Sequence, residues 1–89
     1  MAKSLLVTGA AGFFGANFVH YWAAAHPEDT LVAYDALTYA GNKASLASLL
    51  QLPNFHFVHA DIRDYDQVLA TMREYRVDTV VHFAAESHV

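Results

Sequence analysis

The sequence predicts an α/β fold built on a parallel β-sheet. Four short apolar runs recur along the 89 residues, and each of the first three is followed by a segment whose apolar side chains have helical spacing. This β-α-β-α-β-α-β order predicts right-handed crossovers and a sheet with the strand order 3-2-1-4. With 55% hydrophobic and 16% charged residues, the composition is typical of a globular chain with a packed core.

A glycine-rich turn follows the first strand, within the stretch SLLVTGAAGFFG at residues 4–15. Leu5 to Val7 form an unbroken apolar run, as expected for a central strand covered on both faces. Gly9, Gly12 and Gly15 follow with the spacing GxxGxxG. By analogy with the dinucleotide fingerprint, we expect Gly9 to make the turn, Gly12 to let phosphates approach the backbone, and Gly15 to let the helix pack closely on the sheet.

An acidic residue near the end of the second strand gives this turn a functional context. Asp35 lies twenty residues past Gly15 and directly after the apolar run LVAY at residues 31–34. In dinucleotide-binding domains, a carboxylate at this place accepts hydrogen bonds from the adenine-ribose hydroxyls of NAD. The sequence therefore predicts a Rossmann-type sheet that binds NAD. The alternative is a tight turn without a ligand, followed by a plain loop acid.

Two helices are expected before the third strand. The first runs from Phe13 to about His26, where Pro27 ends it, and its sheet-facing side chains are expected to be Phe14, Phe18, Tyr21, Trp22 and Ala25. The second strand follows at residues 30–34. Asn42 is then expected to cap a short second helix, with a buried stripe formed by Ala44, Leu46, Ala47, Leu49 and Leu50.

The third strand is expected at residues 55–60 (FHFVHA), and it delivers Asp61 and Ile62 to the carboxyl edge of the sheet. Asp64 and Gln67 have the spacing of a capping box at the start of the third helix. The inward side chains of that helix are expected to be Val68, Leu69, Met72 and Tyr75.

The fourth strand is expected at residues 77–84 (VDTVVHFA). In the order 3-2-1-4 it lies beside the first strand, so the glycine turn and residues 84–87 are expected to flank one crevice. Only the third helix covers the second face of the sheet, and the stretch TVVHFAA at residues 79–85 forms an edge without lysine or proline. The 89 residues on their own are therefore expected to self-associate.

The composition excludes several classes of function. Without cysteine, the chain has no disulfide, thiolate metal site or cysteine nucleophile. The net charge of −4 comes without a run of like charges, so nucleic-acid binding is not expected. Because no membrane span and no secretory signal are recognisable, we expect a cytoplasmic protein without a membrane partner. Neither the His20/His26 pair nor the His56/His59 pair converges on one point, so no metal is expected.

Four segments of the chain carry a resemblance to known proteins: TGAAGFFG at 8–15, DALTYAGN at 35–42, HADIRD at 59–64 and HFAAESHV at 82–89. They resemble the extended short-chain dehydrogenase/reductase family, and within it the dTDP-glucose 4,6-dehydratases. The first and third segments occur widely among nucleotide-sugar enzymes, whereas the second and fourth are more specific. Since the family's proteins are several times longer, residues 1–89 are expected to be the N-terminal part of an NAD-binding Rossmann domain, without the catalytic and substrate-binding remainder.

The resemblance implies that the first three segments hold the ADP half of NAD. Phe13 and Phe14 would lie beside the pyrophosphate, and Asp35 would bind the adenine ribose. Asp61 would accept hydrogen bonds from the adenine amino group, and Ile62 would border the ring. The alternative for Asp61 is an acid that merely precedes a helix. The ribose pocket would be lined by Ala36, Leu37 and Thr38.

The resemblance places the fourth segment beside the nicotinamide half of NAD and the substrate. Ser87 would reach the sugar nucleotide. A hydrolytic triad of Ser87, His88 and an acid is not expected, because neighbours on an extended stretch cannot line up as nucleophile, base and orienting group. A solvated acid at the strand end is the alternative for Glu86. The residues beneath the nicotinamide would be Phe83, Ala84, Ala85 and Glu86.

Three residues depart from the usual family pattern. Phe14 and Phe83 are larger than the Ile and Leu usually found there, which we interpret as packing changes. Ala36 replaces a usual Lys and so removes one polar contact to the cofactor.

The activity that the resemblance implies is redox-neutral. NAD takes hydride from C4 of dTDP-glucose, water leaves across C5 and C6, and the same NADH returns hydride to C6, which yields dTDP-4-keto-6-deoxyglucose. The full-length protein would be a homodimer. The family's Tyr-x-x-x-Lys pair is expected to be absent from this chain, so no catalytic residue is assigned. Part of a sugar-nucleotide epimerase and a stand-alone dinucleotide-binding or regulatory module are the alternatives.

Overall fold

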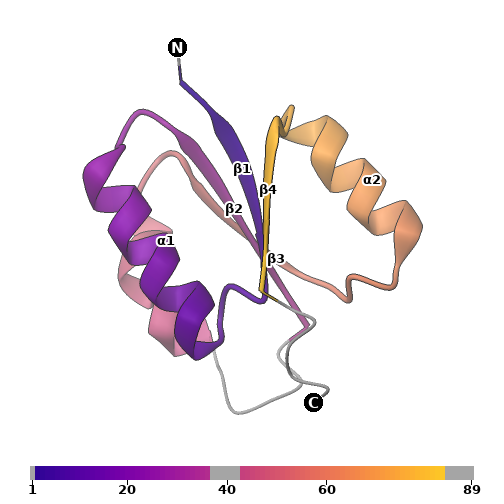
Figure 1. Cartoon of the computed structure of the whole chain (residues 1–89), viewed down its shortest axis with the longest axis horizontal. Helices are drawn as coiled ribbons and strands as arrows, with labels where there is room; N and C mark the ends of the chain where they lie inside the picture. The colour runs from indigo at the N-terminus through magenta and orange to yellow at the C-terminus, as the bar shows by residue number, and fades with distance from the viewer. Residues whose placement is uncertain (1, 37–42, 84–89) are drawn as a thin grey trace.

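A four-stranded parallel sheet forms the centre of the molecule, with helices on both faces (Figure 1). The computed structural model describes residues 2–36 and 43–83, with backbone alone for residues 43–45. The strands are ordered β3-β2-β1-β4. This confirms the predicted α/β class and the strand order 3-2-1-4. None of the helices in the described residues is long and apolar enough to cross a membrane.

Each strand pairs with its neighbour in parallel register. The strands are β1 (Ser4–Thr8), β2 (Thr30–Asp35), β3 (Phe55–His59) and β4 (Thr79–His82). Leu6 of β1 is paired with Val32 on one side and with Val80 on the other. β1 is therefore central, and Leu5, Leu6 and Val7 are each at most 1% exposed. Strand β4 is shorter than predicted: the N–H of Val77 still donates to the Met72 carbonyl at the end of the preceding helix.

The helices are divided between the two faces of the sheet, as Figure 1 shows. α1 (Phe13–Ala25) and the 3₁₀ helix η1 (Lys43–Gln51) cover one face, and α2 (Tyr65–Glu74) covers the other. The core on the α1 side is the larger of the two and contains Leu5, Val7, Val19, Leu31, Ala33, Leu46, Leu49 and Phe55. The core on the α2 side is built on Leu6, Val32 and Tyr34.

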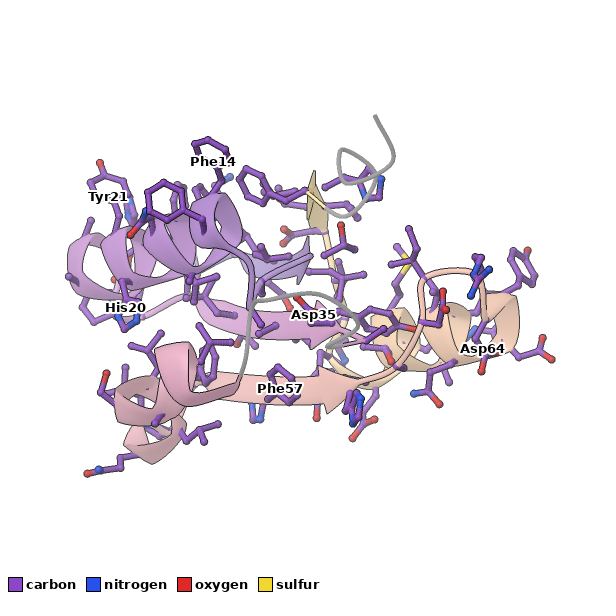
Figure 2. The ribbon with its side chains drawn as sticks, turned by 90° about the horizontal axis from the view of Figure 1, so that it is seen from below. Phe14, His20, Tyr21, Asp35, Phe57 and Asp64 are labelled. Carbon is purple, nitrogen blue, oxygen red and sulfur yellow. The ribbon has the colours of Figure 1, made fainter. Side chains whose placement is uncertain are left out.

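The predicted buried stripe of α1 is wrong for Phe14, Tyr21 and Ala25. Phe14 is 66% exposed and Tyr21 is 65% exposed, and both project outward from α1 in Figure 2. The residues of α1 that are buried are Gly15, Ala16 and Val19, with Phe18 and Trp22 packed at the margin. The reason is the close approach of α1 to the glycine loop, which only small side chains allow. A Cβ atom on Gly15 would overlap the carbonyl oxygen of Gly9 and lie 2.8 Å from the Ala10 Cα.

The second helix forms as 3₁₀ rather than α, which changes its buried face. Three residues per turn place Leu46 and Leu49 on the same side, and both are buried as predicted. Ala47 and Leu50 are exposed, so the prediction is wrong for these two. Asn42 lies outside the described residues, and so does the side chain of Ala44.

Helix α2 begins with half of the predicted capping box. The Asp64 carboxylate accepts from the N–H of Gln67 at 3.1 Å. The other half of a capping box would be a hydrogen bond from the Asp64 N–H to the Gln67 side chain. Instead, the Gln67 side chain donates to Thr71 Oγ1 (3.2 Å), and the Asp64 N–H donates to the Asp61 carbonyl (3.0 Å). Three of the four predicted inward side chains pack against the second core, namely Val68, Met72 and Tyr75.

Candidate dinucleotide-binding site

The glycine loop leaves β1 through a turn that requires glycine. Gly9 has a φ of 69°, in the left-handed region that side chains disfavour. Its N–H donates to the Tyr34 carbonyl at 2.9 Å, and its own carbonyl accepts from the N–H of Gly12 at 3.2 Å. The loop therefore turns sharply beside the end of β2 and directs the chain into α1.

Gly12 has no comparable backbone constraint. Its φ of −77° and ψ of 176° are extended values that any residue adopts. It is the N-cap residue of α1, where no side chain makes a capping hydrogen bond and the first turn contains no acidic residue. No side chain in the first turn of α1 therefore offsets the positive end of the helix dipole. This favours an anion at the start of the helix.

Asp35 is the last residue of β2 and lies inside the molecule (Figure 2). It is 2% exposed, and its Oδ2 accepts from the N–H of Ala11 in the glycine loop at 2.7 Å. Its carbonyl accepts from the N–H of Ala60 after β3 at 3.1 Å. Asp35 therefore lies at the end of a strand rather than in a loop, and it joins the glycine loop to β2 and β2 to the segment that follows β3.

Asp61 is engaged by Arg63, two residues further on. The Arg63 guanidinium bonds both carboxylate oxygens, at 2.7 Å from one nitrogen and at 3.1 and 3.2 Å from Nε, and the Arg63 N–H donates at 2.8 Å. These hydrogen bonds lower the pKa of the Asp61 carboxyl to about 2. The carboxylate that the resemblance assigns to adenine is thus ionised and already has a donor. The side chain of Asp64, not that of Asp61, caps α2.

Tyr34 connects the end of β2 to the Asp61 segment. Its ring is fully buried, and its hydroxyl donates to the Asp61 carbonyl at 3.0 Å. Burial raises the pKa of the Tyr34 hydroxyl, and the negative charges of Asp64 and Asp61 raise it further. The spacing of residues along the chain indicates only that Tyr34 belongs to a strand. It does not indicate that the ring is fully buried or that the hydroxyl bonds to residue 61.

The other described site residues lie along the same edge of the sheet. Ile62 is 36% exposed, and the Ala36 carbonyl lies 3.0 Å from His59 Nε2. The N–H of Phe83 donates to the Thr8 carbonyl (3.0 Å), and its ring packs 5.8 Å from that of Phe18. The predicted site residues that lie outside the described part of the chain are Leu37, Thr38, Ala84, Ala85, Glu86 and Ser87.

The carboxyl ends of β1 and β4 are also joined by side chains. Thr8 Oγ1 lies 2.6 Å from His82 Nδ1. Thr8 and His82 are the first residues of the segments 8–15 and 82–89, but their pairing leaves no signal in the sequence. It holds β4 beside the strand from which the glycine loop departs.

One expectation about the sequence itself is wrong. The spacing Tyr-x-x-x-Lys does occur, at Tyr39 and Lys43. Tyr39 lies outside the described residues, and Lys43 is described by its backbone at the start of η1. Nothing in the described structure places these two side chains together, so no catalytic role is assigned to them.

The described side chains offer no other site of comparable chemistry. Within residues 2–36 and 43–83, no three His, Asp or Glu side chains gather as a metal site would require. An apolar cavity of about 220 Å³ lies at the opposite, amino end of the sheet, away from the glycine loop. It is lined by Ala23, Pro27, Leu31, Leu52, Pro53, Asn54 and Phe55.

A comparison with protein families identifies the chain. The family model described as GDP-mannose 4,6 dehydratase matches residues 6–89. The chain belongs to this family. The match includes the last three residues of β1, the glycine loop and Asp35.

Individual members of the family are considerably longer. A dTDP-glucose 4,6-dehydratase of Mycobacterium tuberculosis is 51% identical over 85 residues, which are 96% of this chain and 24% of that protein. The low-salt glycan biosynthesis protein Agl12 of Haloferax volcanii is 49% identical over 96% of this chain and 26% of its own length. The chain therefore spans about a quarter of the curated relatives it matches.

Solved structures share the fold closely. A dTDP-glucose 4,6-dehydratase from Bacillus anthracis, in complex with NAD, superposes with a TM-score of 0.93 at 41% identity, over 97% of this chain and 28% of that one. A UDP-Glc/GlcNAc 4-epimerase from Campylobacter jejuni superposes with a TM-score of 0.82 at 26% identity, over 96% of this chain and 25% of that one. Both kinds of enzyme thus share the arrangement of strands and helices described above.

Proposed function

We propose that this chain is the NAD-binding N-terminal part of a dTDP-glucose 4,6-dehydratase. The observation that carries the proposal is the buried Asp35 carboxylate bonded to the glycine loop, at the carboxyl end of a parallel sheet. In Rossmann-type folds this is where a dinucleotide places its ribose and pyrophosphate. The similar Bacillus anthracis enzyme in complex with NAD supports the same cofactor.

The residues present fit the ADP half of NAD. Gly12 and the first backbone N–H groups of α1 would hold the pyrophosphate, because the helix start carries partial positive charge and no side-chain cap. Asp35 would accept hydrogen bonds from the adenine ribose, and Ile62 would offer apolar surface to adenine. The chemistry that bound NAD supplies in such an enzyme is transient oxidation of the sugar at C4.

Asp61 has a narrower role in this proposal than in the sequence analysis. Its oxygens accept from Arg63, so an adenine amino group would share a carboxylate that already has donors. A carboxylate offers about four acceptor positions, and Arg63 makes four contacts to this one. We therefore assign Asp61 the border of the adenine site rather than its principal contact.

The activity belongs to the longer protein in this proposal. Conversion of dTDP-glucose to dTDP-4-keto-6-deoxyglucose needs substrate-binding and proton-transfer residues, which we place in the remainder beyond residues 1–89, and the whole enzyme would be a homodimer. Phe83, Ala84, Ala85 and Glu86 would lie under the nicotinamide, and Ser87 would contact the nucleotide sugar. The 89 residues alone would be catalytically inert.

The principal alternative is the corresponding part of a sugar-nucleotide epimerase. The fold is shared, but identity to the Campylobacter epimerase is 26%, against 51% to the Mycobacterium dehydratase. Products separate the two: a dehydratase forms a 4-keto-6-deoxy sugar, whereas an epimerase inverts C4 and retains the oxygen on C6. A regulatory dinucleotide-binding module would bind NAD and form neither product.

The proposal is tested by titrating the purified protein with NAD in a calorimeter. Gly12→Val is expected to abolish binding, because the valine methyl groups would occupy the space of the pyrophosphate. Phe14→Ile, two residues further on in the first turn of α1, is the matched control. The replacement restores the Ile that is usual in the family at this position, and it leaves the core unchanged because Phe14 is 66% exposed, so binding should persist. If the valine variant folds and binds NAD as well as the wild type does, the glycine loop is structural and the proposed function fails.

A further inference from the structure

The end of β2 holds the glycine loop at two successive residues. The Tyr34 carbonyl accepts from the N–H of Gly9 at 2.9 Å, and Asp35 Oδ2 accepts from the N–H of Ala11 at 2.7 Å. The first bond is between backbone groups and is independent of the side chain at position 34. The second depends on the carboxylate, so the Asp35 side chain contributes directly to the attachment of the middle of the loop to the sheet.

The hydrogen bond from the Ala11 N–H to the Asp35 carboxylate is short and buried. Asp35 and Ala11 are each 2% exposed, so water does not compete for either group. A hydrogen bond to an ionised carboxylate is shorter and stronger than one between neutral groups, and the distance of 2.7 Å fits this class. Removing the carboxylate would take an acceptor from a buried N–H, and a buried donor that loses its partner favours a rearranged backbone.

We propose that Asp35 is a positioning residue for the phosphate-binding loop, in addition to its role as a ribose ligand. The carboxylate fixes Ala11, and with it the extended Gly12 that begins α1. The two halves of the ADP site are thereby coupled through one side chain. The ligand part of this inference rests on the proposed function, whereas the attachment of the loop does not.

The proposal and its simplest competitor predict opposite effects on an anion. If Asp35 served only the ribose, replacing it would remove a negative charge near the pyrophosphate, and an anion held by the loop would bind equally well or more tightly. If Asp35 positions the loop, the same replacement displaces the donors, and the anion binds less tightly. Inorganic pyrophosphate distinguishes the two, because it has no ribose.

The first measurement is hydrogen exchange of the Ala11 amide, without ligand, in wild type, Asp35→Ala and Asp35→Asn. Exchange is expected to be at least about tenfold faster in Asp35→Ala, since a charged acceptor is lost. Asp35→Asn should lie between, because its amide oxygen accepts but is neutral. Asp64→Ala is the matched control: it removes the acceptor of the Gln67 N–H and should leave Ala11 unchanged.

The second measurement is a pyrophosphate titration of the same variants, with an NAD titration of the wild type beside it. Pyrophosphate affinity should fall at least about threefold in Asp35→Ala, and less in Asp35→Asn. Unchanged Ala11 exchange, or pyrophosphate affinity equal to or above that of the wild type, overturns the positioning role. If Asp35→Ala does not fold, Asp35→Asn carries both tests. A wild type that binds no NAD contradicts the proposed function instead, while the exchange rates still decide whether Asp35 holds the loop.

Discussion

Gly9, Gly12 and Gly15 lie within one stretch of seven residues, and the structure itself constrains two of them, each in a different way. Gly9 adopts a φ of 69°, and Gly15 lies so close to the Gly9 carbonyl that a Cβ cannot be accommodated. Gly12 has an ordinary extended backbone. The proposed function accounts for its lack of a side chain by a pyrophosphate that would approach the backbone there.

Gly15→Ala is expected to lower the free energy of unfolding by about 1–3 kcal/mol, because overpacking against backbone atoms forces the helix away from the loop. The added Cβ would meet the Gly9 carbonyl and the Ala10 Cα, neither of which can rotate aside. Urea unfolding followed by circular dichroism measures the change. Asn17→Ala, at an exposed position of the same helix, should alter stability by less than about 0.5 kcal/mol. Equal stability of the two variants would contradict the close approach.

Asp35 also predicts a preference for NAD over NADP. A 2′-phosphate would lie beside a carboxylate in a largely desolvated site, and the next residue, Ala36, supplies no positive charge to offset it. Like charges at such a distance cost on the order of a few kcal/mol, which corresponds to at least about tenfold discrimination. Calorimetric titration with both cofactors measures the ratio. Asp35→Ser should reduce the ratio and Asp61→Asn should not, while equal affinities in the wild type would refute the role of Asp35.

At the residue scale, position along the chain predicted the place of Asp35 at the end of the second strand, but not the pairing of Asp61 with Arg63. The distance of Asp35 from the glycines and the strand before it place the residue at a sheet edge, which spacing can indicate. The bond from Ala11 to its side chain depends on how the loop folds back over β2. The Arg63 contacts to Asp61 depend on the turn between β3 and α2, and two residues of separation do not predict such a pair.

At the scale of elements, Asp29 connects the end of α1 to the starts of β1 and β2. Its carboxylate accepts from the Lys3 N–H at 2.8 Å and from Trp22 Nε1 at 2.9 Å, and the neighbouring Thr30 N–H donates to the Lys3 carbonyl. The hydrogen bond from the Lys3 backbone, with that from Trp22, lowers the pKa of the Asp29 carboxyl below its ordinary 3.8. The Asp29 carboxyl therefore binds a proton more tightly in the unfolded chain than in the folded one.

This linkage predicts a loss of stability in acid. The contribution of Asp29 is fully present above pH 3.8 and is lost as the pH falls from there through the lowered folded-state pKa. Asp29→Asn should accordingly be less stable than wild type at pH 7, and the difference should shrink below pH 3.8. Urea unfolding followed by circular dichroism at several pH values measures it. A difference between Asp29→Asn and the wild type that does not change with pH would contradict the linkage.

Strands were easier to predict than the faces of helices. The central strands are unbroken apolar runs, and their order follows from the crossover rule. The helix α1, FFGANFVHYWAAA, is apolar around most of its circumference, so helical spacing fits more than one stripe. The face that lies against the sheet is selected by the contact at Gly15, which involves a loop and is not visible in periodicity. For η1 the period itself differs from the expected one.

At the scale of the whole molecule, the two faces of the sheet are unequally covered. In the described sheet β4 pairs with β1 alone, and Val80 is 51% exposed on the face that also carries Leu6. Helix α2 packs on the core formed by Leu6, Val32 and Tyr34, and Val80 of β4 stays half exposed beside it. An edge strand with exposed apolar side chains offers its backbone to another chain.

The 89-residue chain is therefore expected to self-associate with rising concentration in light-scattering measurements. Val80→Lys should reduce the association, because a charged side chain on an edge strand opposes pairing. Ala24→Lys, at an exposed position of α1, adds the same charge elsewhere and should have little effect. Assays of the same samples for 4-keto-6-deoxy sugar should find no turnover. A stable monomer with measurable turnover would refute this expectation.

Trp22 is the single tryptophan of the chain and is bonded to Asp29 near the last turn of α1. Ten residues of helix separate it from Gly12, a rise of about 15 Å along the axis. The centre of its indole lies 4.2 Å from that of the His26 ring, which is tilted against it, at the end of the sheet opposite the glycine loop. The molecule therefore carries a built-in fluorophore whose emission reports the integrity of the amino end of the sheet, and Phe18, which packs against both Trp22 and Phe83, connects it to the carboxyl end.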